Sequence, residues 1–213
     1  MGYALGKNVK RSYFNIHNRY KGILYLIHSY VCGPLSSSSR SCYLYYVLFI
    51  NDFSRKSWIY FLKAKSETFV KFQEFKALVE NQIGRNIHVL RYDNGGEFDS
   101  HSFNDFCSDA GISKHLTVPY NPQQNGVAKR NNRNMCEAAK SMLHDQDLSS
   151  PLWVKATLTA VSIQNKSTHA IFYEKIPKGV FIGEKPDISY LRIFGSPVYI
   201  CILKEKRTKM EPY

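Results

Sequence analysis

The sequence lacks a long apolar segment. Its longest apolar run covers residues 43–50, whereas a membrane-spanning helix needs roughly 20 apolar residues. The first residues, MGYALGK, contain neither an apolar signal region nor the serine or threonine of a myristoylation site. We therefore expect an intracellular protein, in the nucleus or the cytoplasm, that is not secreted and has no membrane partner.

Cysteine and histidine are sparse and scattered. The five cysteines are odd in number and never spaced as Cys-x-x-Cys, and no two of the seven histidines lie four residues apart. We expect free thiols in a reducing compartment and no zinc site. His28, beside an expected strand, is interpreted as a packed core residue rather than a metal ligand.

Acidic residues are also few. Asp and Glu number 17 against 29 Lys and Arg, which gives a net charge of +12. Excess positive charge favours polyanions, and nucleic acid is the usual one because neutralised phosphates release counterions. The charge indicates DNA or RNA as a partner without establishing it, since many basic proteins bind neither specifically.

The spacing of apolar residues predicts an α/β fold. Strands are expected at 23–31, 43–50, 57–62, 87–92 and 115–118, and helices from Ser66 to a stop at Gly84, at 102–110, at 127–143 and at 151–165. Three consecutive strands predict an antiparallel meander, and the later alternation predicts a five-stranded mixed sheet flanked by helices. Beyond residue 168, β-like runs at 191–194 and 198–203 predict a small β-rich extension after the last helix.

Five motifs stand out in order along the chain: VCGP at 31–34, DFSRKSW at 52–58, DNGGEF at 93–98, PYNPQQNGVA at 119–128 and LRIFG at 191–195. Together they resemble the integrase catalytic core of copia-type retrotransposons, of the ribonuclease H-like superfamily. The resemblance implies a ribonuclease H-like core at 21–168 and a C-terminal extension of the copia type at 169–213. The basic leader at 1–20 resembles the tail of the family's amino-terminal zinc module, with Tyr3 where that module has a cysteine.

The resemblance also implies a catalytic centre of three carboxylates that hold two divalent ions, Mg²⁺ or Mn²⁺, for DNA strand transfer. Such ions polarise the phosphodiester and generate the nucleophile. Asp93 matches the second carboxylate. The first carboxylate is expected directly before the VCGP motif, where the residue is Tyr30. The third is expected directly after Gly-Val-Ala at 126–128, where the residue is Lys129. Thirty-five residues separate Asp93 from Lys129, as in the family.

These substitutions change the charge of the expected cluster from −3 to zero. At 4 Å and an effective dielectric of 20, a like unit charge costs about 4 kcal/mol, so Lys129 should repel a metal. We expect Asp93 to hold a metal weakly or not at all, to form an ion pair with Lys129, and to support no two-metal catalysis. Glu97 is interpreted as the cap of the following helix rather than as a substitute ligand.

The resemblance further implies that the loop at 119–126 and the long helix lie against DNA. The residues assigned to this interface are Gln123, Gln124, Asn125, Lys129, Arg130 and Arg133. Lys129 and Arg133 are four apart and share a helix face that could meet phosphates or could simply be solvated. Trp58 and Trp153 are interpreted as core residues, Asp52 as a turn residue bonded to its own backbone, and Arg55 and Lys56 as a solvated turn.

Three functions remain open at this point. The first is an integrase core by descent, oligomeric by resemblance, whose chemistry is lost. The second is a non-catalytic nucleic-acid-binding domain retained by a host, and the third is a non-functional remnant of a transposon polyprotein.

Overall fold

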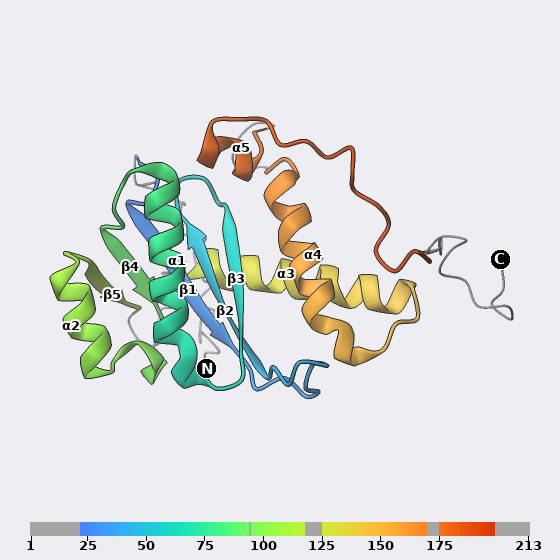
Figure 1. Ribbon diagram of the computed structural model, residues 1–213, viewed down its shortest axis with the longest axis horizontal. Helices are drawn as coiled ribbons and strands as arrows, with labels where there is room; N and C mark the ends of the chain where they lie inside the picture. The colour runs from blue at the N-terminus through green and yellow to red at the C-terminus, as the bar shows by residue number, and fades with distance from the viewer. Residues whose placement is uncertain (1–21, 94, 118–124, 170–174, 199–213) are drawn as a thin grey trace, which may run out of the picture.

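The computed structural model describes residues 22–93, 95–117, 125–169 and 175–198 (Figure 1). It confirms the expected mixed sheet, whose strands are β1 (Leu26–Cys32), β2 (Tyr45–Asn51), β3 (Ser57–Leu62), β4 (Val89–Tyr92) and β5 (Ser113–Leu116). Their order across the sheet is β3-β2-β1-β4-β5. The pairs β1–β2 and β2–β3 are antiparallel, and the pairs β1–β4 and β4–β5 are parallel.

Helices cover both faces of this sheet. A 3-10 turn (Lys65–Glu67) leads into α1 (Thr68–Ile83), which ends at Gly84 with a positive φ of 67° that favours glycine. The remaining helices are α2 (His101–Asp109), α3 (Gly126–Asp145), α4 (Trp153–Lys166) and α5 (Pro177–Ile182). In Figure 1, α1 lies in front of the sheet and α3 passes behind it.

Two apolar clusters, one on each face, hold these layers together. Phe72 and Phe75 of α1 pack with Phe49 of β2 on the first face, and Phe49 and Phe75 are stacked at 4.5 Å. Met135 of α3 and Ala156 of α4 belong to the cluster on the second face. Burying one phenylalanine contributes roughly 1.5–3 kcal/mol, so α1 is fixed firmly against β2.

The C-terminal extension differs from its sequence-based prediction. Its described part, residues 175–198, contains the short helix α5 and no strand. The run at 191–194 remains largely exposed, with Ile193 75% accessible, and it pairs with no strand of the sheet. Most of the run at 198–203 lies outside the described residues. Phe181 of α5 is buried and meets the Trp58 ring edge-on at 5.0 Å, so this part of the extension packs onto the core.

Candidate active site and nucleic-acid interface

The parallel pairing of β1 and β4 brings Tyr30 and Asp93 together. The last paired residues are His28 and Arg91, and Tyr30 and Asp93 each lie two residues further along the chain, Tyr30 within β1 and Asp93 directly after β4. The carboxyl ends of parallel strands are where sites form in such sheets. Both side chains are partly buried, and the negative charge of Asp93 is close enough to raise the pKa of Tyr30, although burial is the larger cause.

The start of α3 adds Lys129 to this pair. Asn125 is buried, and its side-chain Nδ2 donates to the Ser29 carbonyl oxygen at 3.3 Å. Ser29 directly precedes Tyr30 in β1. Ala128 is buried on the inner side of α3, whereas Lys129 is exposed. The first turn of α3 is therefore anchored to β1, and the charge of Lys129 acts on Asp93.

Charges of both signs act on the Asp93 carboxyl group. Burial raises its pKa, the neighbouring Glu97 raises it further, and Lys129 and Lys65 lower it. The expected ion pair between Asp93 and Lys129 is not formed: within the described part of the chain, no nitrogen–oxygen distance of 4.0 Å or less joins them. The two residues interact electrostatically without direct contact.

Glu97 has a role that sequence patterns did not indicate. Its side chain is buried, and its Oε1 lies 2.6 Å from Lys65 Nζ in an ion pair. The expected helix cap is made instead by Ser100, whose Oγ accepts a hydrogen bond from the Phe103 backbone N–H at 3.3 Å. Glu97 therefore ties the segment after β4 to the turn before α1, a contact across 32 residues that no local motif predicts.

The donor set at this site is poor for metals. Among the described residues, no group of three or more His, Cys, Asp or Glu side chains could hold a metal ion. Glu97 is a second carboxylate whose charge acts on Asp93, and it already pairs with Lys65.

Polar residues lie on both sides of α3: asparagines on the side that faces the sheet and cations on the exposed side. Asn131 donates from Nδ2 to Ser57 Oγ at 2.9 Å, and Asn132 Oδ1 accepts from the Tyr46 hydroxyl at 2.6 Å. The buried positions 128, 131, 135 and 139 follow helical spacing, which is the signal that could have placed Asn131 inside. The cations on the opposite side, which we call the α3 basic strip, are all exposed: Lys129, Arg130 and Arg133. Gln123 and Gln124 lie outside the described residues, and Asn125 differs from the strip because its side chain is buried.

The turn between β2 and β3 is buried rather than solvated, which corrects the interpretation of Arg55 and Lys56. Arg55 is 5% exposed and Lys56 9%. Asp52 Oδ1 lies 3.0 Å from both His28 Nε2 and Arg55 Nη1. Asn51 makes the turn bond, accepting from the Ser54 backbone N–H at 2.8 Å. This polar network fixes the start of β1 to the end of β2, and His28 is a core residue as expected.

The chain resembles known transposon proteins over nearly its whole length. The integrase core domain family matches residues 29–122. Over 97% of its length the chain is 41% identical to the retrovirus-related Pol polyprotein from transposon TNT 1-94 of Nicotiana tabacum. Over 90% it is 33% identical to the corresponding polyprotein from transposon RE2 of Arabidopsis thaliana. It spans 16% and 13% of the length of these two polyproteins.

Solved structures share the fold at low sequence identity. The HTLV-2 integrase catalytic core domain in complex with magnesium, in its dimeric form, matches with a TM-score of 0.56 and 18% identity, covering 75% of this chain and 97% of that one. A chain of the simian T-cell lymphotropic virus intasome in complex with PP2A regulatory subunit B56 gamma matches with a TM-score of 0.59 and 16% identity, covering 82% and 65%. These likenesses confirm the ribonuclease H-like fold. The family model and the sequence matches, independently of these structures, identify residues 29–122 as an integrase core domain and the chain as a homologue of the Pol polyproteins of copia-type transposons.

Proposed function

We propose that the chain is a DNA-binding integrase core that has lost metal-dependent strand transfer. The observation that carries this proposal is the set of charges around the ends of β1 and β4. Tyr30 is neutral, because burial keeps the pKa of its phenol above the ordinary value. Asp93 supplies one carboxylate, and Lys129 supplies a cation that acts on it.

Paired Mg²⁺ or Mn²⁺ ions do not fit this arrangement. Hard dications need several oxygen ligands, and their positive charges need nearby carboxylates. Lys129 and Lys65 both place positive charge near Asp93, and Glu97 is engaged by Lys65. Asp93 therefore has little capacity left to bind even one dication, and no step of strand transfer can be assigned to these residues.

The proposal is tested by restoring the two carboxylates. In the variant Tyr30→Asp/Lys129→Glu, Mg²⁺-dependent joining of donor DNA ends should rise well above that of the chain as it stands. Adding Asp93→Asn to this variant is the matched control and should abolish the gain. If the unaltered chain joins ends above background, the proposed loss of catalysis is wrong. If the folded double variant stays inactive, a remodelled host-retained binder is favoured over a damaged enzyme.

DNA binding is supported by the exposure of the α3 basic strip beside the candidate site and by the net charge of +12. Positive side chains on one helix face can contact successive phosphates. Binding that uses them must weaken as salt rises, because each contact releases about one counterion.

The strip can be tested by substituting Arg130→Ala and Arg133→Ala together. We expect weaker binding to linear DNA and a salt slope that is shallower by about 0.9 for each lost phosphate contact. Arg85→Ala, which removes an exposed arginine after α1, is the control and should change the slope less. Equal slopes for all three proteins would exclude the strip from the interface.

We also propose that the chain self-associates. The structural neighbours include a dimeric and a trimeric form of the HTLV-2 core, and the apolar residues Val70 and Leu78 of α1 and Ile163 of α4 are 41–52% exposed. Sedimentation velocity should reveal a concentration-dependent oligomer. A monomer at every concentration would contradict this.

A further inference from the structure

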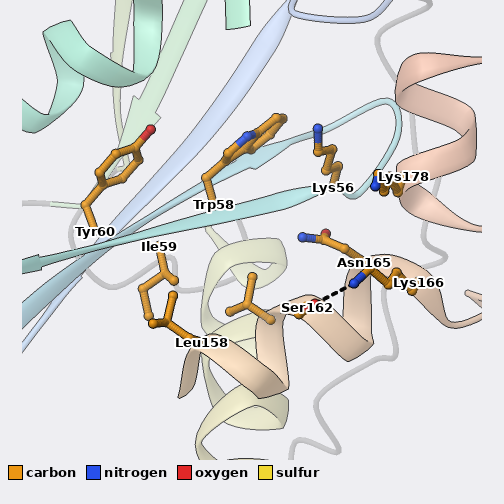
Figure 2. Close-up of a pocket in the computed structure, with 10 residues that line it drawn as sticks. Lys56, Trp58, Ile59, Tyr60, Leu158, Ser162, Asn165, Lys166 and Lys178 are labelled. Atoms are coloured by element: carbon orange, nitrogen blue, oxygen red, sulfur yellow. Dashed lines mark hydrogen bonds between the residues drawn. The ribbon is translucent and has the colours of Figure 1, made fainter. Parts of the chain in front are cut away.

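A second basic site lies at the β3 edge of the sheet, away from Asp93. A pocket of about 430 Å³ is formed by the start of β3, by α4 and by α5 (Figure 2). We call it the edge pocket. Figure 2 shows Lys56, Lys166 and Lys178 gathered at one end; at the other end, Ile59 and Leu158 lie on the α4 side of β3, and Tyr60 points to the opposite side of this edge strand. The pocket therefore has a cationic end and an apolar end.

The edge pocket is separate from the candidate active site. Strand β3 is an edge strand, with β2 between it and β1. Tyr30 pairs with Leu48, which pairs with Ile59, whereas Lys56 precedes the first residue of β3. Lys56 thus lies two strands away from Tyr30 and three residues nearer the other end of the sheet.

Within the part of the chain that the structure describes, no carboxylate pairs with the positive charge in the pocket. No acidic residue lines the pocket, and no carboxylate among the described residues lies within 4.0 Å of any of the three lysines. Lys56 is 9% exposed, and its Nζ lies 4.6 Å from the Trp58 ring centroid and 4.2 Å from that of Phe181. Burial lowers the pKa of Lys56 to about 8, and the neighbouring Lys178 contributes to this.

The pocket walls are held in place before any ligand arrives. Asn165 of α4 accepts from the Ser57 backbone N–H at 2.8 Å and donates to the Ser57 carbonyl at 2.7 Å. Lys166 Nζ donates to Ser162 Oγ at 2.9 Å and to the Tyr190 hydroxyl. Because both bonds of Asn165 fix α4 to β3, binding would need little rearrangement of these elements.

We propose that the edge pocket binds a nucleotide, with the phosphate among the three lysines and the planar base toward the opposite, apolar end of the pocket. A phosphate would supply the charge that the lysines lack, and charge-assisted hydrogen bonds to a buried ammonium are strong. The volume lies within the range of small-molecule sites, which combine apolar walls with a few polar groups. The nucleotide can come from two sources, a free mononucleotide or one unit of a nucleic-acid strand.

The test uses the whole chain with Arg130→Ala and Arg133→Ala, so that the α3 basic strip does not contribute. Calorimetric titration compares AMP, adenosine, inorganic pyrophosphate and a single-stranded five-residue oligonucleotide. AMP should bind saturably and at least tenfold more tightly than adenosine or pyrophosphate. Displacement of AMP by the oligonucleotide would assign the site to a nucleic-acid strand, and binding of AMP alone would assign it to a free nucleotide.

Two lysine variants decide whether binding takes place in the edge pocket. Lys178→Ala, which removes a partly exposed side chain from α5, should weaken AMP or oligonucleotide binding at least tenfold; Lys166→Ala should do the same. Lys155→Ala, exposed on α4 outside the pocket, should leave binding unchanged. The proposal is overturned if no probe binds saturably, or if Lys155→Ala weakens binding as much as Lys178→Ala does. Near-ultraviolet circular dichroism verifies that each variant is folded.

Discussion

At the scale of single residues, Asp93 is surrounded by charges of both signs. Lys129 and Lys65 act to lower its pKa, while burial and Glu97 act to raise it. In a site built for two dications the metals themselves would supply the positive charge. Here lysine side chains supply it, so a metal would have to compete with charges that belong to the protein.

Lys56 provides a residue-scale prediction about stability. Burial lowers the pKa of Lys56 to about 8 in the folded protein, from 10.5. Below pH 8 the ammonium is charged in both the folded and unfolded states, so folding bears the full cost of burying the charge. Between pH 8 and 10.5 the folded state has released this proton and the unfolded state has not, so the cost falls as pH rises.

The unfolding free energy of the unaltered chain, relative to Lys56→Met, should therefore increase between pH 7 and pH 9.5. The expected gain is about 1 to 2 kcal/mol after allowance for solvent screening. Urea unfolding of both proteins at the two pH values measures it. A difference that stays constant with pH would mean that the pKa of Lys56 is not lowered by folding.

Local sequence identified some site residues and missed others for a physical reason. Asp93 could be found because its motif is contiguous and lies directly after a strand. Glu97 was misassigned, since its partner Lys65 is brought near only when β4 and α1 pack together. Lys56 looked solvated because turn residues usually are, but Phe181, more than a hundred residues later, covers it.

At the scale of elements, one side chain of α4 makes a double polar contact with the start of β3. Asn165 makes two hydrogen bonds to the backbone of Ser57, the first residue of the edge strand. A third bond reaches the same residue from Asn131 of α3. Polar contacts with α3 and α4 thus hold the start of β3. Both helices also contribute to the second apolar cluster, on the same face of the sheet.

Substituting Asn165→Ala should leave the Ser57 backbone N–H without its partner. Each net hydrogen bond contributes about 1 kcal/mol and an unsatisfied buried donor costs about 1–3 kcal/mol, so we expect a loss of about 2 kcal/mol in the free energy of unfolding. Amide hydrogen exchange at Ser57 should also accelerate. Asn134→Ala, on the exposed side of α3, is the control. Unchanged exchange at Ser57 in the Asn165 variant would show that this junction is held by other contacts.

Most elements could be predicted from sequence because their apolar spacing is regular. Strand β3 has the predicted bounds, and α1 ends at the predicted glycine. The extension could not be predicted in this way. Its run at 191–194 has apolar residues typical of a strand but pairs with no described strand, and strands are stabilised by their neighbours rather than by composition alone.

At the scale of the whole molecule, the excess positive charge is organised into more than one region. The α3 basic strip lies beside the candidate active site, and the edge pocket gathers three lysines two strands away. No described helix has the length and apolar character to span a membrane. The molecule has the fold of an integrase core, and we propose that its surface binds polyanions and that the charge of its centre disfavours paired metals.

The central claim, that this centre does not hold a metal pair, is tested most directly by Mn²⁺ titration. The unaltered chain and the Tyr30→Asp/Lys129→Glu variant are compared by calorimetry, with Asp93→Asn added to each as the control for binding elsewhere. We predict no saturable Mn²⁺ binding that depends on Asp93 in the unaltered chain, and such binding in the restored variant. Asp93-dependent binding of two Mn²⁺ ions by the unaltered chain, as tight as in the restored variant, would contradict the account.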